Sequence, residues 1–153
     1  MKKLIVIIYA LSTSYLCFGA TLISMSKKQI KQVFINKTSI SIATDNLNGR
    51  DINNTFSMFL DTRGKILGKM AQKPADAPQT DKGIYLIKRN GTVYVTWQHW
   101  DNAKQLCFHI FNTQNAYITI DCANVFHSVF MKNAIIPGNH LSLRKTNLND
   151  FHK

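Results

Sequence analysis

The sequence predicts a mainly β protein, in which an antiparallel meander closes into a barrel and one short helix lies near the N-terminus. Between residues 83 and 131, short runs rich in β-branched and aromatic residues alternate with polar turn sequences, which is typical of β-barrels and sandwiches. The stretch from 84 to 100 is apolar on both of its faces, so we expect it to be covered on both sides, as in a closed or sandwiched sheet. Helical spacing of apolar residues is found at Ile30, Val33 and Phe34.

The N-terminal segment has the features of an export signal. Two lysines precede an apolar run from Leu4 to Phe18, and the small residues Gly19 and Ala20 follow it. This order is typical of a secretory signal peptide, and the run is shorter than the roughly 20 residues of a membrane-spanning helix. A retained membrane anchor is the alternative. We expect an exported protein, periplasmic or secreted, with no transmembrane segment in the mature chain and with three parts: a signal peptide (1–20), one β domain (21–140) and a polar tail (141–153).

The elements before residue 83 follow from local signals. Ser26 and Gln29 form a capping-box pattern, which predicts the start of a helix. Asp61 and Gly64 suit the first and last positions of a type I turn, which predicts a hairpin. In order, the expected elements are the helix (27–34), a strand (38–44), a polar loop (45–54), the hairpin (55–70) and a second loop (71–82).

The next hairpin is predicted around Asn90-Gly91, between strands at 84–89 and 92–100. This pair favours a two-residue type I′ turn, because both central positions of that turn need a positive φ. Such a turn would place Leu86 opposite Val95 and Ile84 opposite Trp97. The face that we expect to meet the core then carries Ile84, Leu86, Val93, Val95 and Trp97.

The predicted meander ends with strands at 105–110, 117–122 and 125–131, and with an edge segment at 135–136. Matching the apolar faces of the first two strands places Phe108 near Ile120. In this register Cys107 and Cys122 point to opposite faces, so a disulfide between them would need a bulge or a one-residue slip. We keep the bridged and the unbridged forms as alternatives, since an exported protein can form disulfides.

The charge of the chain limits the classes of partner. Without the two lysines of the signal segment, 17 of the 19 basic residues remain against 8 acidic ones, a net charge of +9. Such an excess of positive charge can bind nucleic acid, anionic lipid or an acidic protein. The basic residues are scattered along the sequence, however, which favours a solvated surface. Aromatic residues near Lys88 and Arg89 would suit a platform for single-stranded nucleic acid. Export argues against that partner, so we expect no nucleic acid.

The sequence offers little for catalysis. It contains no glycine-rich phosphate loop, no GxSxG elbow and no CxxC pair, and we predict no cofactor. Cys107 and His109 lie two residues apart and would share a strand face, which is a weak indication of a Cys/His hydrolase. His99, His109 and His127 would bind zinc only if their three strands directed them to one face. We therefore predict no metal site.

Several short motifs occur in a recognisable order between about residues 25 and 140. After the N-terminal helix they are Lys37-Thr38, Thr55-Phe56 with the turn at 61–64, Gly83-Ile84-Tyr85, Thr96-Trp97, Cys107-Phe108 and Pro137-Gly138-Asn139. This order resembles a family of small exported bacterial proteins with a lipocalin-like β-barrel. The resemblance implies that fold and export, and it implies no activity. The family pattern has a cysteine three residues before the tryptophan, where this chain has Tyr94, so the resemblance leaves Cys107 without its usual partner.

These observations favour an exported, non-enzymatic binding protein for a small apolar ligand, or for a protein partner in the envelope or the host. The side chains that we expect to line its cavity or core are Ile84, Leu86, Val95, Trp97, Phe108 and Ile110. The alternative is an inhibitor-type protein whose basic surface or loops block an acidic partner. The Cys/His hydrolase is the least favoured hypothesis.

Overall fold

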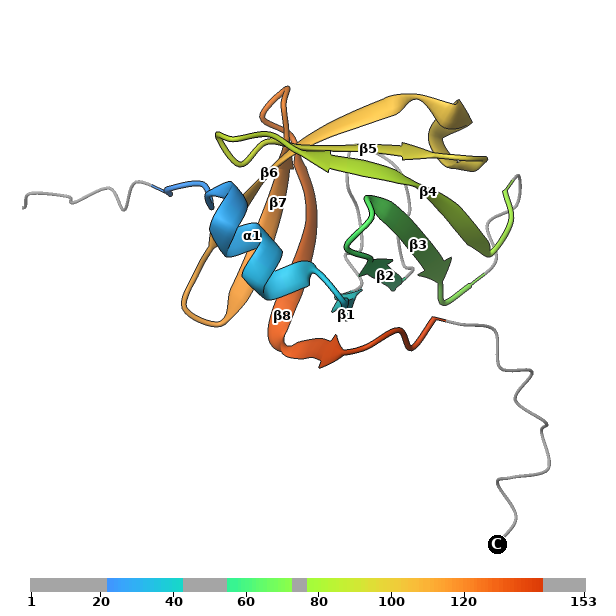
Figure 1. Ribbon diagram of the computed structural model, residues 1–153, viewed down its shortest axis with the longest axis horizontal. Coiled ribbons are helices and arrows are strands. Elements are labelled where there is room, and N and C mark those ends of the chain that lie inside the picture. The colour runs from blue at the N-terminus through green and yellow to red at the C-terminus, as the bar shows by residue number, and fades with distance from the viewer. Residues whose placement is uncertain (1–21, 43–54, 73–76, 142–153) are drawn as a thin grey trace, which may run out of the picture.

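The computed structural model describes residues 22–42, 55–72 and 77–141 (Figure 1). The predicted signal peptide, the predicted loop at 45–54 and the tail from residue 142 lie outside the described residues. Within them, each strand pairs antiparallel with the next in the sequence, and β1 pairs with β8, which closes the sheet into an eight-stranded barrel. The predicted fold class, a closed antiparallel meander with one short N-terminal helix, is therefore confirmed.

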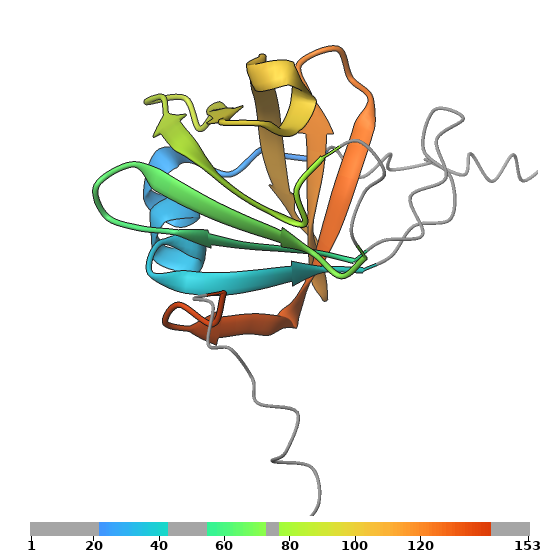
Figure 2. The same cartoon turned by 90° about the vertical axis from the view of Figure 1, so that its right-hand side faces the viewer.

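The strands follow the chain around the barrel without a crossover, and Figure 2 shows them arranged about a common interior. A short 3₁₀ turn, Trp100–Ala103, joins the fifth strand to the sixth. The strands are β1 (Lys37–Ser41), β2 (Phe56–Leu60), β3 (Lys65–Met70), β4 (Thr80–Ile87), β5 (Val93–Trp97), β6 (Gln105–Asn112), β7 (Ala116–Asp121) and β8 (Phe126–Pro137).

The helix α1 (Lys27–Phe34) has the predicted span and covers one end of the barrel. Its capping box is formed as predicted: the Gln29 amide donates to the Ser26 hydroxyl, and the Ser26 amide donates to the Gln29 side chain. The apolar stripe of the helix faces inward, since Ile30 and Phe34 are both completely buried. No described helix is long and apolar enough to cross a membrane.

The register between β4 and β5 differs by one residue from the prediction. Ile84 lies opposite Thr96 and Leu86 opposite Tyr94, rather than opposite Trp97 and Val95. Because side chains alternate between faces, the one-residue shift turns Ile84 and Leu86 to the outside of the barrel. They are 61% and 58% exposed, so their assignment to the core-facing side was wrong.

The turn between these strands explains the shift. The Gly91 amide donates to the Lys88 carbonyl at 3.0 Å, and the Lys88 amide donates to the Thr92 carbonyl at 2.9 Å. Of Asn90 and Gly91, Gly91 alone has a positive φ. This is a type I turn followed by a glycine bulge, with three residues in the loop instead of two.

The register between β6 and β7 is also shifted by one residue. Phe108 lies opposite Asp121 rather than beside Ile120, and Cys107 consequently meets Cys122 on the outer face. Their α-carbons are 5.5 Å apart and their sulfurs form a disulfide. Of the two alternatives left by the sequence, the structure contains the bridged form.

Among the strands that are longer than predicted, β4 and β8 extend furthest beyond their predicted bounds. β4 begins at Thr80, inside the predicted loop, because its polar first residues pair with Lys69 and Gly68 of β3. β8 continues to Pro137, so residues 135–136 are part of the strand that closes the barrel and are not an edge segment. In both places, backbone pairing with a neighbouring strand, β3 for β4 and β1 for β8, extends the strand beyond its local sequence signal.

We expect Gly91→Ala to destabilise the protein more than the matched control Gly138→Ala. Both glycines have a φ of +89°, which costs an alanine about 1–2 kcal/mol. A Cβ on Gly91 would also lie 2.0 Å from the Met25 carbonyl oxygen, whereas on Gly138 the nearest heavy atom is 3.8 Å away. In urea denaturation, Gly91→Ala should lower the unfolding free energy by about 3 kcal/mol or more. Equal losses in the two variants would contradict the packing of Met25 on this turn.

Candidate functional site

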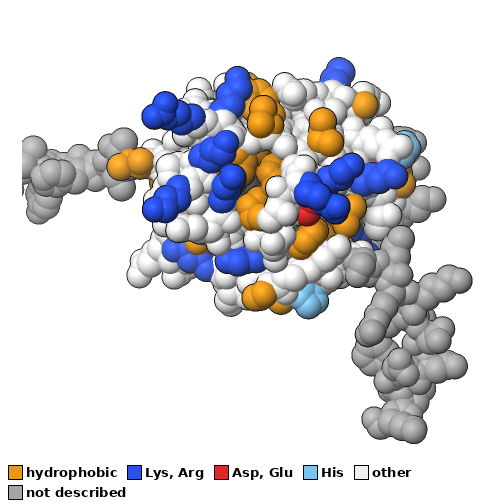
Figure 3. Space-filling model, in the orientation of Figure 1, with side chains coloured by type: hydrophobic (Ala, Val, Ile, Leu, Met, Phe, Trp, Pro, Cys, Tyr) orange, Lys and Arg blue, Asp and Glu red, His pale blue; other side chains and the backbone are white. Residues whose placement is uncertain are grey.

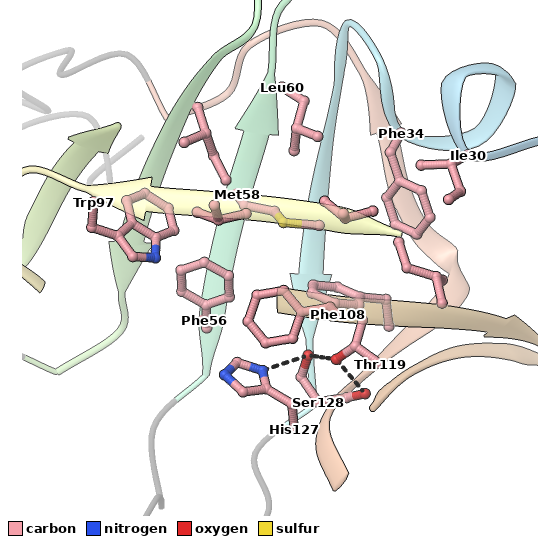
Figure 4. A pocket seen from close by; sticks show the side chains of 15 residues that line it. Ile30, Phe34, Phe56, Met58, Leu60, Trp97, Phe108, Thr119, His127 and Ser128 are labelled. Atoms are coloured by element: carbon pink, nitrogen blue, oxygen red, sulfur yellow. Dashed lines mark hydrogen bonds between the residues drawn. The ribbon is translucent and has the colours of Figure 1, made fainter. Parts of the chain in front are cut away.

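The interior of the barrel contains a cavity of about 70 Å³. It lies between α1 and Trp97, and its lining side chains come from α1 and from β2, β3, β5, β6, β7 and β8 (Figure 4). Most of them are aliphatic or aromatic, such as Ile30, Met58, Ile66 and Val95. An apolar space of this kind, with a few polar groups at one edge, is the usual form of a small-molecule site.

Aromatic rings close the two ends of the cavity. At the α1 end, the buried ring of Phe34 makes edge contacts with Tyr117 and Phe130, with ring centroids 5.3 and 6.0 Å apart. At the other end, Phe56 meets Trp97 edge-on at 5.9 Å. Such edge contacts are the preferred geometry for aromatic pairs, so both ends are firmly packed.

One edge of the cavity is polar. The hydroxyl oxygens of Thr119 on β7 and Ser128 on β8 are 2.5 Å apart, and the Thr119 hydroxyl also donates to the Ser128 carbonyl at 3.2 Å. Nδ1 of His127 lies 3.5 Å from the Ser128 hydroxyl. Figure 4 shows the three side chains together below the ring of Phe108, whose centroid is 4.5 Å from that of His127.

A bulge in β8 brings His127 to this edge. Thr119 pairs with Ser128, but the next residue of β7, Ile120, pairs with Phe126, so His127 is the additional residue on β8. In a regular strand the neighbours His127 and Ser128 would point to opposite faces. The bulge redirects the histidine, and both residues line the cavity.

The environment of His127 lowers its pKa, which favours the neutral imidazole at pH 7. Desolvation by the surrounding wall lowers its pKa, and the nearby carboxylates of Asp101 and Asp121 oppose this shift only in part. The residue also reaches the surface, where it is exposed, so it connects the cavity edge with solvent. With the hydroxyls of Thr119 and Ser128 it offers hydrogen-bond donors and acceptors, but no full positive charge.

Four of the six predicted lining residues do line the cavity: Val95, Trp97, Phe108 and Ile110. Ile84 and Leu86 lie on the outer face, as the register correction requires. Whether any of the six contacts a ligand stays a prediction. Sequence reasoning did not find Thr119, Ser128 and His127 as a polar group, because alternation alone cannot reveal a bulge.

A second hollow, an open cleft of about 530 Å³, lies on the outside of the barrel near the start of β4. Asp81 is buried beneath it and accepts hydrogen bonds from the amides of His99 (2.7 Å) and Trp100 (2.8 Å). Its other carboxylate oxygen is 3.0 Å from Nδ1 of His99.

The Asp81–His99 pair resembles the oriented histidine of a hydrolase, but no serine, threonine or cysteine in the described part of the chain is hydrogen-bonded to His99. The evident role of Asp81 is to fix the chain after β5.

The geometry of Asp81 also sets its charge. Burial would raise the pKa of this carboxyl, but the hydrogen bonds from the amides of Trp100 and His99, and from the His99 ring, outweigh burial and hold the pKa below its usual value of 3.8. The carboxylate is therefore charged in the native protein above that pH.

The other candidate catalytic and metal-binding residues named from the sequence do not form a site in the described structure. Cys107 and His109 share the outer face of β6 as predicted, but the Cys107 sulfur is bonded to Cys122, so it is not a free thiolate nucleophile. His109 instead places Nε2 3.8 Å from the Cys122 sulfur. His99, His109 and His127 do not converge, and in the described ranges no three histidine, cysteine or acidic side chains are grouped as metal ligands.

Comparison of the chain with protein-family models, with curated proteins and with solved structures found no match. The fold stands as an eight-stranded antiparallel meander barrel.

We expect Asp81→Asn to destabilise the protein by about 2 kcal/mol or more, because hydrogen bonds to a buried charge are stronger than those to a neutral amide. The pH dependence has a definite sign. The native pKa is lowered, so the charge stabilises the fold above pH 3.8, and this contribution is lost as the pH falls through the native pKa. Chemical denaturation of both proteins between pH 7 and 2 measures the effect.

The exposed carboxyl of Asp101 supplies the matched control. Asp101→Asn should leave the unfolding free energy nearly unchanged. If Asp81→Asn behaved in the same way, the hydrogen bonds of Asp81 would not be what fixes the chain after β5.

Proposed function

We propose that the protein is a non-enzymatic binding protein for a small, mainly apolar molecule that carries one neutral hydrogen-bonding group. The observation that supports this function is the interior cavity, which is apolar along most of its wall and has the polar group Thr119, His127 and Ser128 at one edge. An interior filled only for stability would have no need of a bulge that turns a histidine toward it.

The volume of the cavity limits the ligand. Sites for drug-sized ligands measure about 300–1,000 Å³, whereas this cavity has about 70 Å³. A long acyl chain is too large unless side chains move. A compact ligand of a few heavy atoms fits the space between Phe34 and Trp97.

The polar edge of the cavity limits the chemistry of the ligand. A neutral imidazole and two hydroxyls can satisfy a hydroxyl or a carbonyl group. They provide no cation for a carboxylate or phosphate, and Asp101 and Asp121 lie close enough to His127 to influence its pKa. We therefore favour a small alcohol, ketone or aldehyde over an acid.

The lipocalin-like class and the export of the protein belong to the same proposal. The closed meander with an N-terminal helix supports the first. The disulfide between Cys107 and Cys122 is consistent with an oxidising compartment and so supports the second. The signal-peptide pattern in residues 1–20 points the same way.

The test uses cyclopentanol and its apolar match, cyclopentane, as probes. Titration followed by methyl NMR should shift the resonances of cavity residues such as Ile66, Val95 and Ile110. Ser128→Ala should reduce the preference for cyclopentanol over cyclopentane by about 2- to 10-fold, since one hydrogen bond contributes about 0.5–1.5 kcal/mol. If neither probe shifted the cavity methyls of the unmodified protein, the proposed function would be wrong.

Ser57→Ala is the matched control for that experiment. Ser57 lies on β2, opposite Lys69, on the face that points away from the cavity. Its replacement should leave both affinities unchanged, and an effect equal to that of Ser128→Ala would contradict the assignment of the polar edge.

A further inference from the structure

The outer face of β3 and β4 carries a cluster of exposed apolar side chains. Ile84 and Leu86, the residues that the register turns outward, are 61% and 58% exposed. Tyr94 lies opposite Leu86 on β5, and Leu67 on β3 points to the same outer face. Single exposed apolar residues are common on protein surfaces, but neighbouring ones surrounded by polar groups mark an interaction site.

Lysines surround this cluster. Alternation along β4 puts Lys82 on the same face as Ile84 and Leu86. Lys88 follows the strand directly, at the other end of the apolar pair, and its ammonium lies 4.6 Å from the centroid of the Tyr94 ring. Lys65 of β3 lies directly opposite Ile84. Figure 3, which views the molecule as in Figure 1, shows apolar side chains in the middle of this face with lysine and arginine side chains around them.

The cationic rim continues onto α1. Lys28 and Lys31 line a shallow cleft together with Arg89 of the β4–β5 turn. The turn and the helix are in close contact there, because Gly91 packs against Met25. The basic surface therefore extends beyond the two strands.

Acidic groups do not neutralise these lysines. Within the described strands β3, β4 and β5, the one acidic residue is Asp81, and it is buried. In the turn before β3, Asp61 pairs with Arg63 at 3.1 Å. The face is therefore complementary to a negatively charged surface.

An anionic phospholipid bilayer matches both properties of the face. Its headgroups attract lysines, and the boundary between headgroups and acyl chains accepts aliphatic side chains. A soluble polyanion would attract the lysines but would gain little from two exposed aliphatic residues. We propose that the outer face of β3 and β4 docks the protein on an anionic membrane surface, with Ile84 and Leu86 entering the headgroup region.

The experiment is flotation with vesicles of phosphatidylcholine alone or mixed with phosphatidylglycerol. We expect binding to the mixed vesicles that weakens at high salt, and little binding to phosphatidylcholine alone. Ile84→Thr combined with Leu86→Thr should lower the partition coefficient at least tenfold, while threonine keeps a high strand propensity. Ile84→Trp should raise the coefficient, because tryptophan favours the interface.

Matched variants separate the docking face from general effects of charge and hydrophobicity. Lys82→Gln with Lys88→Gln should lower the partition coefficient about 25-fold, at roughly fivefold per cation. Lys104→Gln with Lys132→Gln removes the same charge elsewhere and should have a much smaller effect. Ile136→Thr replaces another exposed aliphatic residue, on β8, and should leave binding unchanged.

Two outcomes would overturn the proposal. One is the absence of binding to phosphatidylglycerol vesicles. The other is a result in which the double threonine variant binds the vesicles as strongly as the unmodified protein, and soluble heparin binds with similar affinity. The face would then be a general polyanion site. The expected result for heparin is weak binding that is insensitive to the threonine substitutions.

Discussion

The three-residue turn between β4 and β5 is the constraint on which the arrangement of this barrel depends. The positive φ of Gly91 forms the bulge, and the absence of a side chain lets the Met25 carbonyl approach the turn closely. The same turn therefore sets the register of two strands and seats the segment that leads into α1. A register shifted by one residue would exchange the inner and outer faces of β4. The apolar outer cluster therefore follows from this turn, because Ile84 and Leu86 lie on the face of β4 that the register turns outward.

The interior combines firm packing with one local irregularity. Aromatic contacts at Phe34 and at Trp97 hold the two ends, and they leave a small space between them. The bulge in β8 adds His127 to the hydroxyls of Thr119 and Ser128 at one edge of that space. Proteins keep bulges where a side chain has to be redirected, often beside functional sites. The small apolar space and the neutral polar groups at its edge are the features on which the proposed binding function rests.

Much of this fold could be predicted from the sequence, and the errors share one physical origin. The helix, its capping box and the succession of hairpins depend on neighbouring residues, which the sequence displays directly. Register depends on tertiary contacts, such as that between Met25 and Gly91. The expected two-residue turn placed Ile84 and Leu86 inside, whereas the inner face of β4 carries Gly83, where a Cβ would lie 2.2 Å from the Thr96 carbonyl oxygen. A one-residue error in register also separated Cys107 from Cys122 in the prediction. Sequence periodicity did not indicate the bulge at His127.

The most direct test of this account is methyl NMR with a soluble paramagnetic probe that broadens the signals of exposed groups. The structure predicts strong broadening for Ile84 and Leu86 and protection for Ile87 and Ile110, which are 3% and 5% exposed. The register expected for a two-residue turn would protect Ile84 and Leu86 and expose Ile87. That reversed pattern would contradict the inner and outer faces assigned to β4 and, with them, the outer apolar cluster.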